Sequence, residues 1–229
     1  MNFFGHAAIA SGTGGSPAFI LGAMLPDFLA MLRLRTTPRD AHQGESELGR
    51  GMAFHHVTDH VFHDSPAFQA LSRDAFAALL EAGLARGPSR ALAHIGIELL
   101  LDETPEMKAL GASGYLAALA YGRESGVRQL VSESGLGEAG ASLEALLDLL
   151  ATRGVRAGKP TLPEVCERLR RALANRPRLA FSPRDDAQIC AWLAHARSIV
   201  ATHAPLVLSE VWAGLAARGY ARTQTLSRT

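Results

Sequence analysis

The sequence predicts an all-α fold, and three observations support this prediction. Apolar residues recur three and four positions apart, as in the segment from Ile189 to Val200, which is the spacing of one helix face. Runs that alternate apolar and polar residues, as strands do, are absent from the sequence. Helix-start signals recur along the whole length. We therefore expect one all-helical domain of 229 residues.

Several helix starts are marked by a hydroxyl residue followed by proline, because the hydroxyl caps the helix and proline suits its first position. These pairs are Ser16-Pro17, Ser65-Pro66, Thr104-Pro105 and Ser182-Pro183. The segment from Thr161 to Glu164 has the form of a capping box. The predicted helices cover residues 2–11, 17–32, 48–64, 66–83, 88–103, 105–122, 139–153, 162–175 and 183–218. We expect the last to break near Pro205, because proline removes a helical hydrogen bond.

Composition narrows the function classes. The net charge of +1 gives no basic footprint for nucleic acid. The two cysteines, Cys166 and Cys190, form no zinc-knuckle or disulfide pattern, which suits a reducing cytosol. The apolar run at residues 18–32 is interrupted by Pro26 and Asp27 and is too short to span a bilayer. We expect a cytoplasmic protein without nucleic-acid or membrane partners.

The segment from Gly51 to Asp64 holds four histidines and two carboxylates, the ligand types that catalytic divalent metals use most often. In a helix, His55, Asp59 and His63 fall on one stripe, four residues apart. The neighbouring stripe holds His56, His60 and Asp64. The segment therefore predicts a metal site, with a hydrated histidine-rich helix face as the alternative.

Other ionisable side chains stand among apolar neighbours, where burial is costly unless they are paired or bound to a metal. They are His6, Asp27 and the i, i+4, i+8 series His94, Glu98 and Asp102. We predict that they meet the histidine-rich helix in one site within residues 1–103, whereas residues 104–229 form a helical half without a motif. The alternatives are a core histidine at position 6, a cap at position 27 and an exposed helix face for Glu98 and Asp102.

Short segments of the first half resemble the acyl-carrier-protein phosphodiesterase family, an all-helical group related to the HD-domain phosphohydrolases. Residues 2–6 resemble its Asn-Phe-Leu-Ala-His start, and residues 22–28 its Gly-x-x-x-x-Asp-Phe region. Residues 51–59 and the following Pro66 keep the spacing of its Gly-Ile-x-x-His-Arg-x-x-Asp segment. Glu98 and Asp102 resemble its paired acidic residues. The departures are His56 for arginine, His63 for aspartate, Ser65 for histidine, Glu98 for aspartate and Glu103 for histidine.

The resemblance implies an HD-like helical fold, a divalent ion that is commonly manganese, and hydrolysis that releases phosphopantetheine from a carrier-protein serine. The resulting hypothesis is a metal-dependent phosphodiesterase that uses a metal-activated water. The candidate ligands for manganese, iron, zinc or magnesium are His6, Asp27, His55, Asp59, His63 and Glu98. The candidate catalytic residues are His56, His94 and Asp102: the carboxylate would accept a proton, and a histidine would protonate the leaving oxygen or bind phosphate.

Two other classes of protein stay open. One is a metal- or ligand-binding helical protein without turnover, and the other is an interaction protein with a structural hydrogen-bond network. An acyl carrier protein is the candidate partner of the enzyme. Its acidic surface would need basic residues at the mouth of the site, and Arg33, Arg35, Arg39 and Arg50 lie in the segment that enters the histidine-rich helix. The polar stretch at residues 33–49 is either a lid over the site or a solvated connector.

Overall fold

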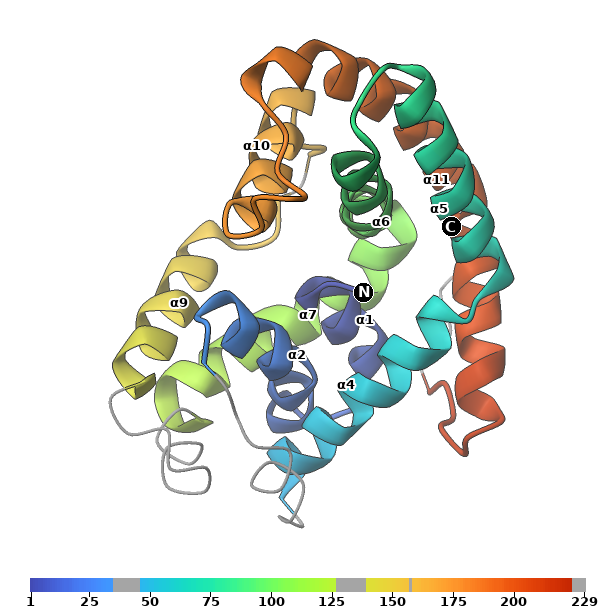
Figure 1. Ribbon diagram of the computed structural model, residues 1–229. Coiled ribbons are helices and arrows are strands. Elements are labelled where there is room, and N and C mark those ends of the chain that lie inside the picture. Colours follow the sequence, from blue (N-terminus) through green and yellow to red (C-terminus); the bar gives the residue numbers. More distant parts are fainter. Residues whose placement is uncertain (35–45, 127–138, 157, 224–229) are drawn as a thin grey trace. The chain divides into compact units, whose positions relative to one another are not determined.

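The computed structural model describes residues 1–34, 46–126, 139–156 and 158–223, and every regular element in these ranges is helical (Figure 1). The prediction of an all-α fold is confirmed. The α-helices are α1 (Phe3–Gly12), α2 (Pro17–Met31), α4 (Glu47–His63), α5 (Pro66–Glu81), α6 (Arg86–Asp102), α7 (Pro105–Tyr121), α9 (Ala139–Arg153), α10 (Leu162–Leu173) and α11 (Asp186–Ala216). A π-helical turn, η1 (Gly122–Gly126), and a 3₁₀ turn, η2 (Pro183–Asp185), complete the set.

Four of the five predicted capping residues act as caps, whereas the hydroxyl of the fifth, Thr104, donates to the carbonyl oxygen of Leu101. Ser16 and Ser65 accept hydrogen bonds from backbone amides in the first turns of α2 and α5. Thr161 and Ser182 form capping boxes that start α10 and η2. These starts were predictable because a cap is a local interaction between residues three positions apart.

The predicted break at Pro205 is wrong, because α11 runs without interruption from Asp186 to Ala216. Proline removes only one helical hydrogen bond, whereas the neighbouring Ala204 and Val207 are fully or almost fully buried and hold this part of the helix in place. The whole helical stretch Pro183–Ala216 is long and apolar enough to cross a membrane by length and composition. A core helix of a soluble protein meets the same test, so this stretch is weak evidence for a membrane span.

The chain divides into two compact units, and each is built from both halves of the sequence. Unit 1 contains Met1–Val61, Pro105–Arg156 and Val211–Thr229; unit 2 contains Phe62–Thr104 and Ala157–Glu210. One boundary, at Thr104 and Pro105, lies next to the predicted division at residue 103. Helix α4 contributes its first fifteen residues to unit 1 and its last two, Phe62 and His63, to unit 2.

In unit 1, α1 packs against α2 and α7, and these helices surround a core of apolar side chains (Figure 1). Ile9, Met24, Phe28 and Phe54 are fully buried in it. The side chain of Asn2 caps α1 by accepting a hydrogen bond from the amide of Phe4. Burial of these large side chains stabilises the unit by roughly 1.5–3 kcal/mol each.

Helices α2 and α4 cross at two glycines, Gly22 and Gly51. A Cβ atom on Gly22 would lie 2.1 Å from the carbonyl oxygen of Leu48, and one on Gly51 would lie 2.1 Å from the carbonyl oxygen of Phe19. Since both obstacles are backbone atoms, no side chain can move aside to make room. The two glycines therefore permit a backbone approach that any larger residue would prevent. Each is the first residue of a segment that resembles the phosphodiesterase family.

In unit 2, α5 packs against α6, and α10 also contacts α6. The indole ring of Trp192 on α11 fills the space above Gly96 on α6. The C-cap of α6 is Glu103, which is buried and forms an ion pair of 3.0 Å with Arg197. Removing one partner of a buried pair leaves an uncompensated charge, so this pair holds the end of α6 in place.

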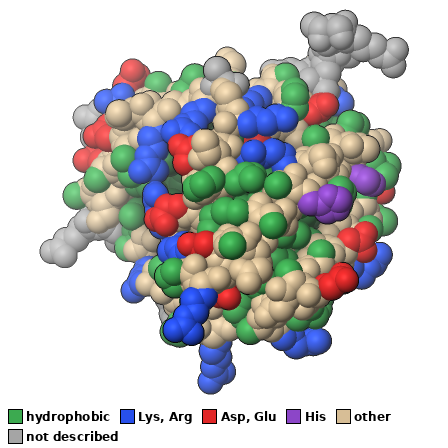
Figure 2. All heavy atoms as spheres, turned by 90° about the horizontal axis from the view of Figure 1, so that it is seen from above, with side chains coloured by type: hydrophobic (Ala, Val, Ile, Leu, Met, Phe, Trp, Pro, Cys, Tyr) green, Lys and Arg blue, Asp and Glu red, His purple; other side chains and the backbone are tan. Residues whose placement is uncertain are grey.

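The surface carries charges of both signs. Figure 2 shows one face of the molecule, where basic side chains form several small groups with acidic side chains between them. This distribution fits the net charge of +1.

Candidate metal centres

Within the part of the chain that the structure describes, two groups of three side chains bring ligand atoms within 4.8 Å of one another. The first, called here the buried cluster, consists of His6, Asp27 and His55, all in unit 1. The second, called here the open cluster, consists of His63, His94 and Glu98, all in unit 2. Both offer two imidazoles and one carboxylate, and both groups could hold a metal ion.

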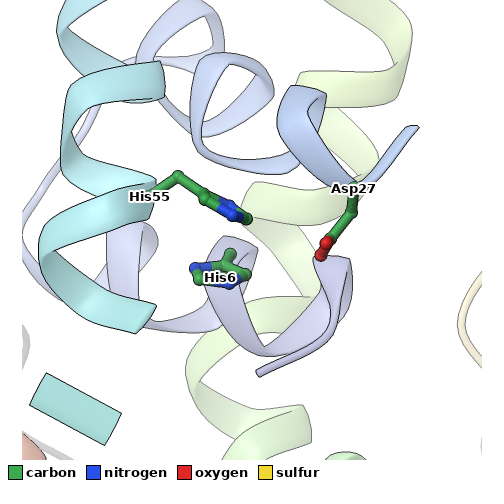
Figure 3. Close-up of side chains that lie close together, drawn as sticks. All are labelled: His6, Asp27 and His55. Carbon is green, nitrogen blue, oxygen red and sulfur yellow. The ribbon is translucent and has the colours of Figure 1, made fainter. Parts of the chain in front are cut away.

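Three helices of unit 1 supply the buried cluster. His6 comes from α1, Asp27 from α2 and His55 from α4, and the three side chains extend into a common space (Figure 3). His55 lies one helical turn after Gly51, so the close crossing of α2 and α4 sets the distance between His55 and α2.

The orientation of His55 is held by a hydrogen bond to backbone. Its Nδ1 lies 2.9 Å from the carbonyl oxygen of Ala23. Because a carbonyl only accepts, Nδ1 carries the hydrogen and Nε2 keeps a lone pair. Ala23 lies in the turn of α2 where Pro26 removes one helical hydrogen bond. Burial, reinforced by the nearby His6, lowers the pKa of His55 to about 3, so the ring is neutral at pH 7.

His6 is completely buried and is held in the same way. Its Nδ1 lies 2.8 Å from the hydroxyl oxygen of Thr58, and this hydroxyl donates to the carbonyl oxygen of Phe54 or His55. Nδ1 of His6 therefore donates to Thr58, which leaves the lone pair on Nε2. The His6 and His55 rings also stack, with centroids 3.8 Å apart. The hydrogen bond at Nδ1 and the stacked ring together fix the orientation of each histidine, as is usual for a metal ligand.

Asp59 lies at the edge of the buried cluster. Its Oδ1 is 3.7 Å from Nε2 of His6 and accepts a hydrogen bond of 3.0 Å from the α-amino group of Met1. Its side chain is partly exposed, as is Asp27. Asp59 thus reaches solvent, whereas Oδ2 of Asp27 and the two histidines are buried.

The open cluster brings its three ligand atoms into direct contact. Nε2 of His63 lies 3.2 Å from Nε2 of His94 and 3.3 Å from Oε1 of Glu98, and Nε2 of His94 lies 3.2 Å from the same oxygen. His63 is the last residue of α4, whereas His94 and Glu98 lie one turn apart on α6. The three atoms form a nearly equilateral triangle.

The environment of the open cluster is mixed. The Glu98 side chain is only 9% exposed, but those of His63 and His94 are 31% and 45% exposed. Burial acts to raise the pKa of Glu98, but hydrogen bonds from His63 and His94 outweigh it and hold the pKa well below its usual range. A cavity of about 490 Å³ adjoins the two histidines; its lining residues are His63, Phe68, Gln69, Ser72, Arg73 and His94.

Two predicted catalytic residues lie outside both groups. His56 is exposed on α4, and its ring is in edge contact with that of His55. Asp102 is the last residue of α6 and is partly exposed. His94, the third predicted catalytic residue, is a member of the open cluster, beside the predicted ligands His63 and Glu98. Arg50 pairs with Glu47, and Arg35 and Arg39 lie outside the described residues, as does most of the predicted lid.

Two further residues near the open cluster's helices, Ser65 and Glu103, have structural roles. Ser65 caps α5 and also donates a hydrogen bond to Glu210. Glu103 forms the buried ion pair with Arg197. Sequence reasoning missed Thr58 as the support of His6. One signal was available: Thr58 is a hydroxyl residue within the histidine-rich helix, three positions after His55.

The fold and the two clusters define an all-helical protein with two groups of side chains that could hold metal ions. No protein-family model, curated protein or solved structure matches the chain.

Proposed function

We propose that the protein is a divalent-metal-dependent hydrolase that cleaves phosphodiesters, with its metal held by the buried cluster. The observation that carries this proposal is the state of the two histidines. In both His6 and His55 the hydrogen is on Nδ1, which is bonded inside the protein, so the lone pair is on Nε2. Two such nitrogens within 4.8 Å of the Asp27 carboxylate make a metal-ligand set.

The donor set fits a divalent ion. Two neutral imidazoles and a carboxylate suit manganese, iron or zinc, and the resemblance to the phosphodiesterase family favours manganese. His55 needs no proton release to bind a cation at neutral pH, because burial already keeps it neutral. Asp59 is close enough to His6 to serve as a fourth ligand or to orient that ring.

The residues around the cluster suit hydrolysis. A bound divalent ion would supply Lewis-acid polarisation of a phosphoryl oxygen and would make water more acidic. Asp59 is partly exposed and would accept a proton from the attacking water. His56 is exposed beside His55 and would protonate the leaving oxygen or bind phosphate.

The proposed substrate is a phosphoester, and an acyl carrier protein is the candidate partner. This part of the proposal rests on the resemblance of residues 2–6, 22–28 and 51–59 to the phosphodiesterase family. The structure adds a physical reason for three of these residues: Asn2 caps α1, and Gly22 and Gly51 permit the close crossing of α2 and α4.

The test is to measure bound metal by elemental analysis and hydrolysis of an aryl phosphodiester with added manganese. We expect His55→Ala and Asp27→Asn to lower activity by roughly 100-fold or more, because each removes a ligand atom. The matched control is His195→Ala, which removes an exposed histidine on α11 that lies outside both clusters. Full activity in His55→Ala would refute the proposal.

A second candidate is a metal-binding protein of the same fold without turnover. The burial of the two histidines favours this candidate, since His6 is 0% exposed and His55 is 7% exposed. A catalytic metal keeps one coordination position open to substrate or water, which such burial restricts. Binding of metal at the buried cluster without hydrolysis of any phosphodiester tested would support this candidate over the enzyme.

A further inference from the structure

The open cluster has the geometry of a metal-binding triangle. Its three edges, between two imidazole nitrogens and one carboxylate oxygen, measure 3.2, 3.2 and 3.3 Å. A tetrahedral zinc ion with bonds of about 2.0–2.1 Å places neighbouring ligand atoms about 3.3–3.4 Å apart. An octahedral magnesium ion with bonds of about 2.0–2.1 Å would place them about 2.9 Å apart. The observed edges therefore fit zinc better than magnesium.

The contact between the two histidines also suits a cation. Both rings present Nε2 to the other, at 3.2 Å. In the metal-free protein both nitrogens donate to Oε1 of Glu98, so their hydrogens crowd each other across this contact, and a cation that replaces them removes the conflict. A cation would accept lone pairs from His63, His94 and Glu98 at once. The competing arrangement is a proton shared within the triangle, which predicts no metal affinity.

The ligands are held in place before any ion binds. The two imidazole rings stack with centroids 4.9 Å apart, and the Phe68 ring makes edge contacts of 5.4 Å with both. Glu98 is nearly buried and follows His94 by one turn, so the α6 backbone sets their spacing. His63 lies at the C-terminal end of α4, where the helix dipole favours positive charge.

One side of the triangle faces the cavity of about 490 Å³, which leaves room for a further ligand. The cavity wall on α5 carries Gln69, Ser72 and Arg73, three residues on one face of the helix. The Ser72 hydroxyl oxygen is buried and has no hydrogen-bond partner among the described residues. A cation and an amide beside a metal complement an anionic oxygen ligand.

We propose that His63, His94 and Glu98 form a zinc centre, separate from the metal of the buried cluster, and that its open position binds a small oxyanion such as phosphate. The site has the two-histidine, one-carboxylate ligand set of catalytic zinc. Arg73 supplies the positive charge on the cavity wall. The inference does not depend on the proposed function, because its ligands and its unit are different.

The first experiment measures zinc stoichiometry and affinity for the full chain after removal of metal by a chelator. We expect His94→Ala and Glu98→Gln to abolish one binding event or weaken it by at least 100-fold, because each removes one of three ligands. His195→Ala controls for adventitious binding to an exposed histidine. Circular dichroism of each metal-free variant checks that it is folded. Unchanged zinc affinity in folded His94→Ala and Glu98→Gln would overturn the proposal.

The same titration separates this inference from the proposed function. If both sites bind, the wild type takes two equivalents of zinc, and His55→Ala loses one while His94→Ala loses the other. If the buried cluster binds no metal, the wild type takes one equivalent, His94→Ala loses it and His55→Ala keeps it. The second result supports the zinc centre and shows that the buried cluster does not bind zinc.

The second experiment tests the open position. Cobalt replaces zinc in the His55→Ala variant, so that only the open cluster contributes a cobalt spectrum, and inorganic phosphate is then titrated. We expect phosphate to change the visible absorption, with affinity about 10-fold weaker in the additional variant Arg73→Ala. Arg90→Ala is the matched control, since Arg90 is an exposed arginine that does not line the cavity. A spectrum insensitive to phosphate would refute the oxyanion site.

Discussion

The two clusters contain the same kinds of side chain in opposite surroundings. In the buried cluster the histidines are shielded from solvent and bonded through Nδ1 to Ala23 and Thr58, and the ligand atoms lie within 4.8 Å of one another. In the open cluster the ligand atoms lie 3.2–3.3 Å apart and the histidines are partly exposed. In the buried cluster, the hydrogen bonds inside the core determine which ring nitrogen can bind a metal. In the open cluster, exposure leaves a coordination position of the metal free for a ligand from solution.

The largest expected effect comes from the helix crossing that supports only the buried cluster. Gly51→Ala places a Cβ atom 2.1 Å from the carbonyl oxygen of Phe19 and 2.9 Å from the amide nitrogen of Ala23. Since both are backbone atoms, α2 and α4 must separate, and we expect a loss of about 3 kcal/mol in the free energy of unfolding. Urea unfolding measures it, and metal affinity at the buried cluster should fall as well.

Gly158→Ala is the matched control for this change. A Cβ atom on Gly158 meets no atom within 4 Å, so its free energy of unfolding should stay within about 0.5 kcal/mol of the wild type. If Gly51→Ala were equally mild, the close approach of α2 and α4 would not be what positions His55.

A smaller effect is expected at the residue that starts α5 beside the open cluster. Ser65 accepts a hydrogen bond from the Phe68 amide and donates one to Glu210. Ser65→Ala removes the cap, and we expect a loss of about 1–2 kcal/mol in the free energy of unfolding. Because Ser65 lies between His63 and Phe68, zinc affinity at the open cluster should also weaken. Thermal unfolding and zinc titration measure the two effects.

Ser198→Ala is the control for Ser65→Ala. Ser198 is exposed, and its hydroxyl donates only to the carbonyl oxygen of His195 in the same helix. Its loss should change the free energy of unfolding by less than about 0.5 kcal/mol. Equal effects of the two substitutions would show that the cap does not support the open cluster.

Local interactions made most of the fold predictable from the sequence. Helix starts at Ser16, Ser65 and Thr161 depend on residues three positions away, and all three were confirmed. The break expected at Pro205 failed because burial of Ala204 and Val207 outweighs the loss of one hydrogen bond. Tertiary packing therefore overrode local propensity at that position.

The ligands of the candidate sites were predictable as residue types, but their grouping was not. The i, i+4 spacing of His94 and Glu98 indicated a shared helix face, and the structure places both ligand atoms within 3.2 Å of each other. The pairing of His63 with these two depends on how α6 packs against the start of α5, which has no local sequence signal. The hydrogen bond from His55 to the Ala23 carbonyl could not be predicted from the sequence either, since any residue at position 23 supplies a backbone carbonyl.

The smallest expected effect is a pH dependence that belongs to the buried cluster. Burial lowers the pKa of His55 to about 3 in the folded protein, against an ordinary value of 6.5. Between these values the unfolded chain binds a proton at His55 that the folded chain does not, so stability falls as the pH falls. From pH 7.5 to 5.5 we expect His55 to account for a loss of about 1.4 kcal/mol in the free energy of unfolding of the metal-free protein. Urea unfolding at both pH values measures it.

The same measurement on the His55→Gln variant isolates this effect. Glutamine does not titrate, and all other histidines are present in both the wild type and the variant. The open cluster contributes little through its carboxylate in this range, since hydrogen bonds from His63 and His94 overcome the effect of burial and keep the pKa of Glu98 below its ordinary value of 4.5. Glu98 therefore stays charged at pH 5.5, and its stabilising bonds are lost only on further acidification. If the free energy of unfolding fell equally on acidification in the wild type and in His55→Gln, burial would not be holding His55 neutral. The two clusters would then differ only in their geometry and exposure.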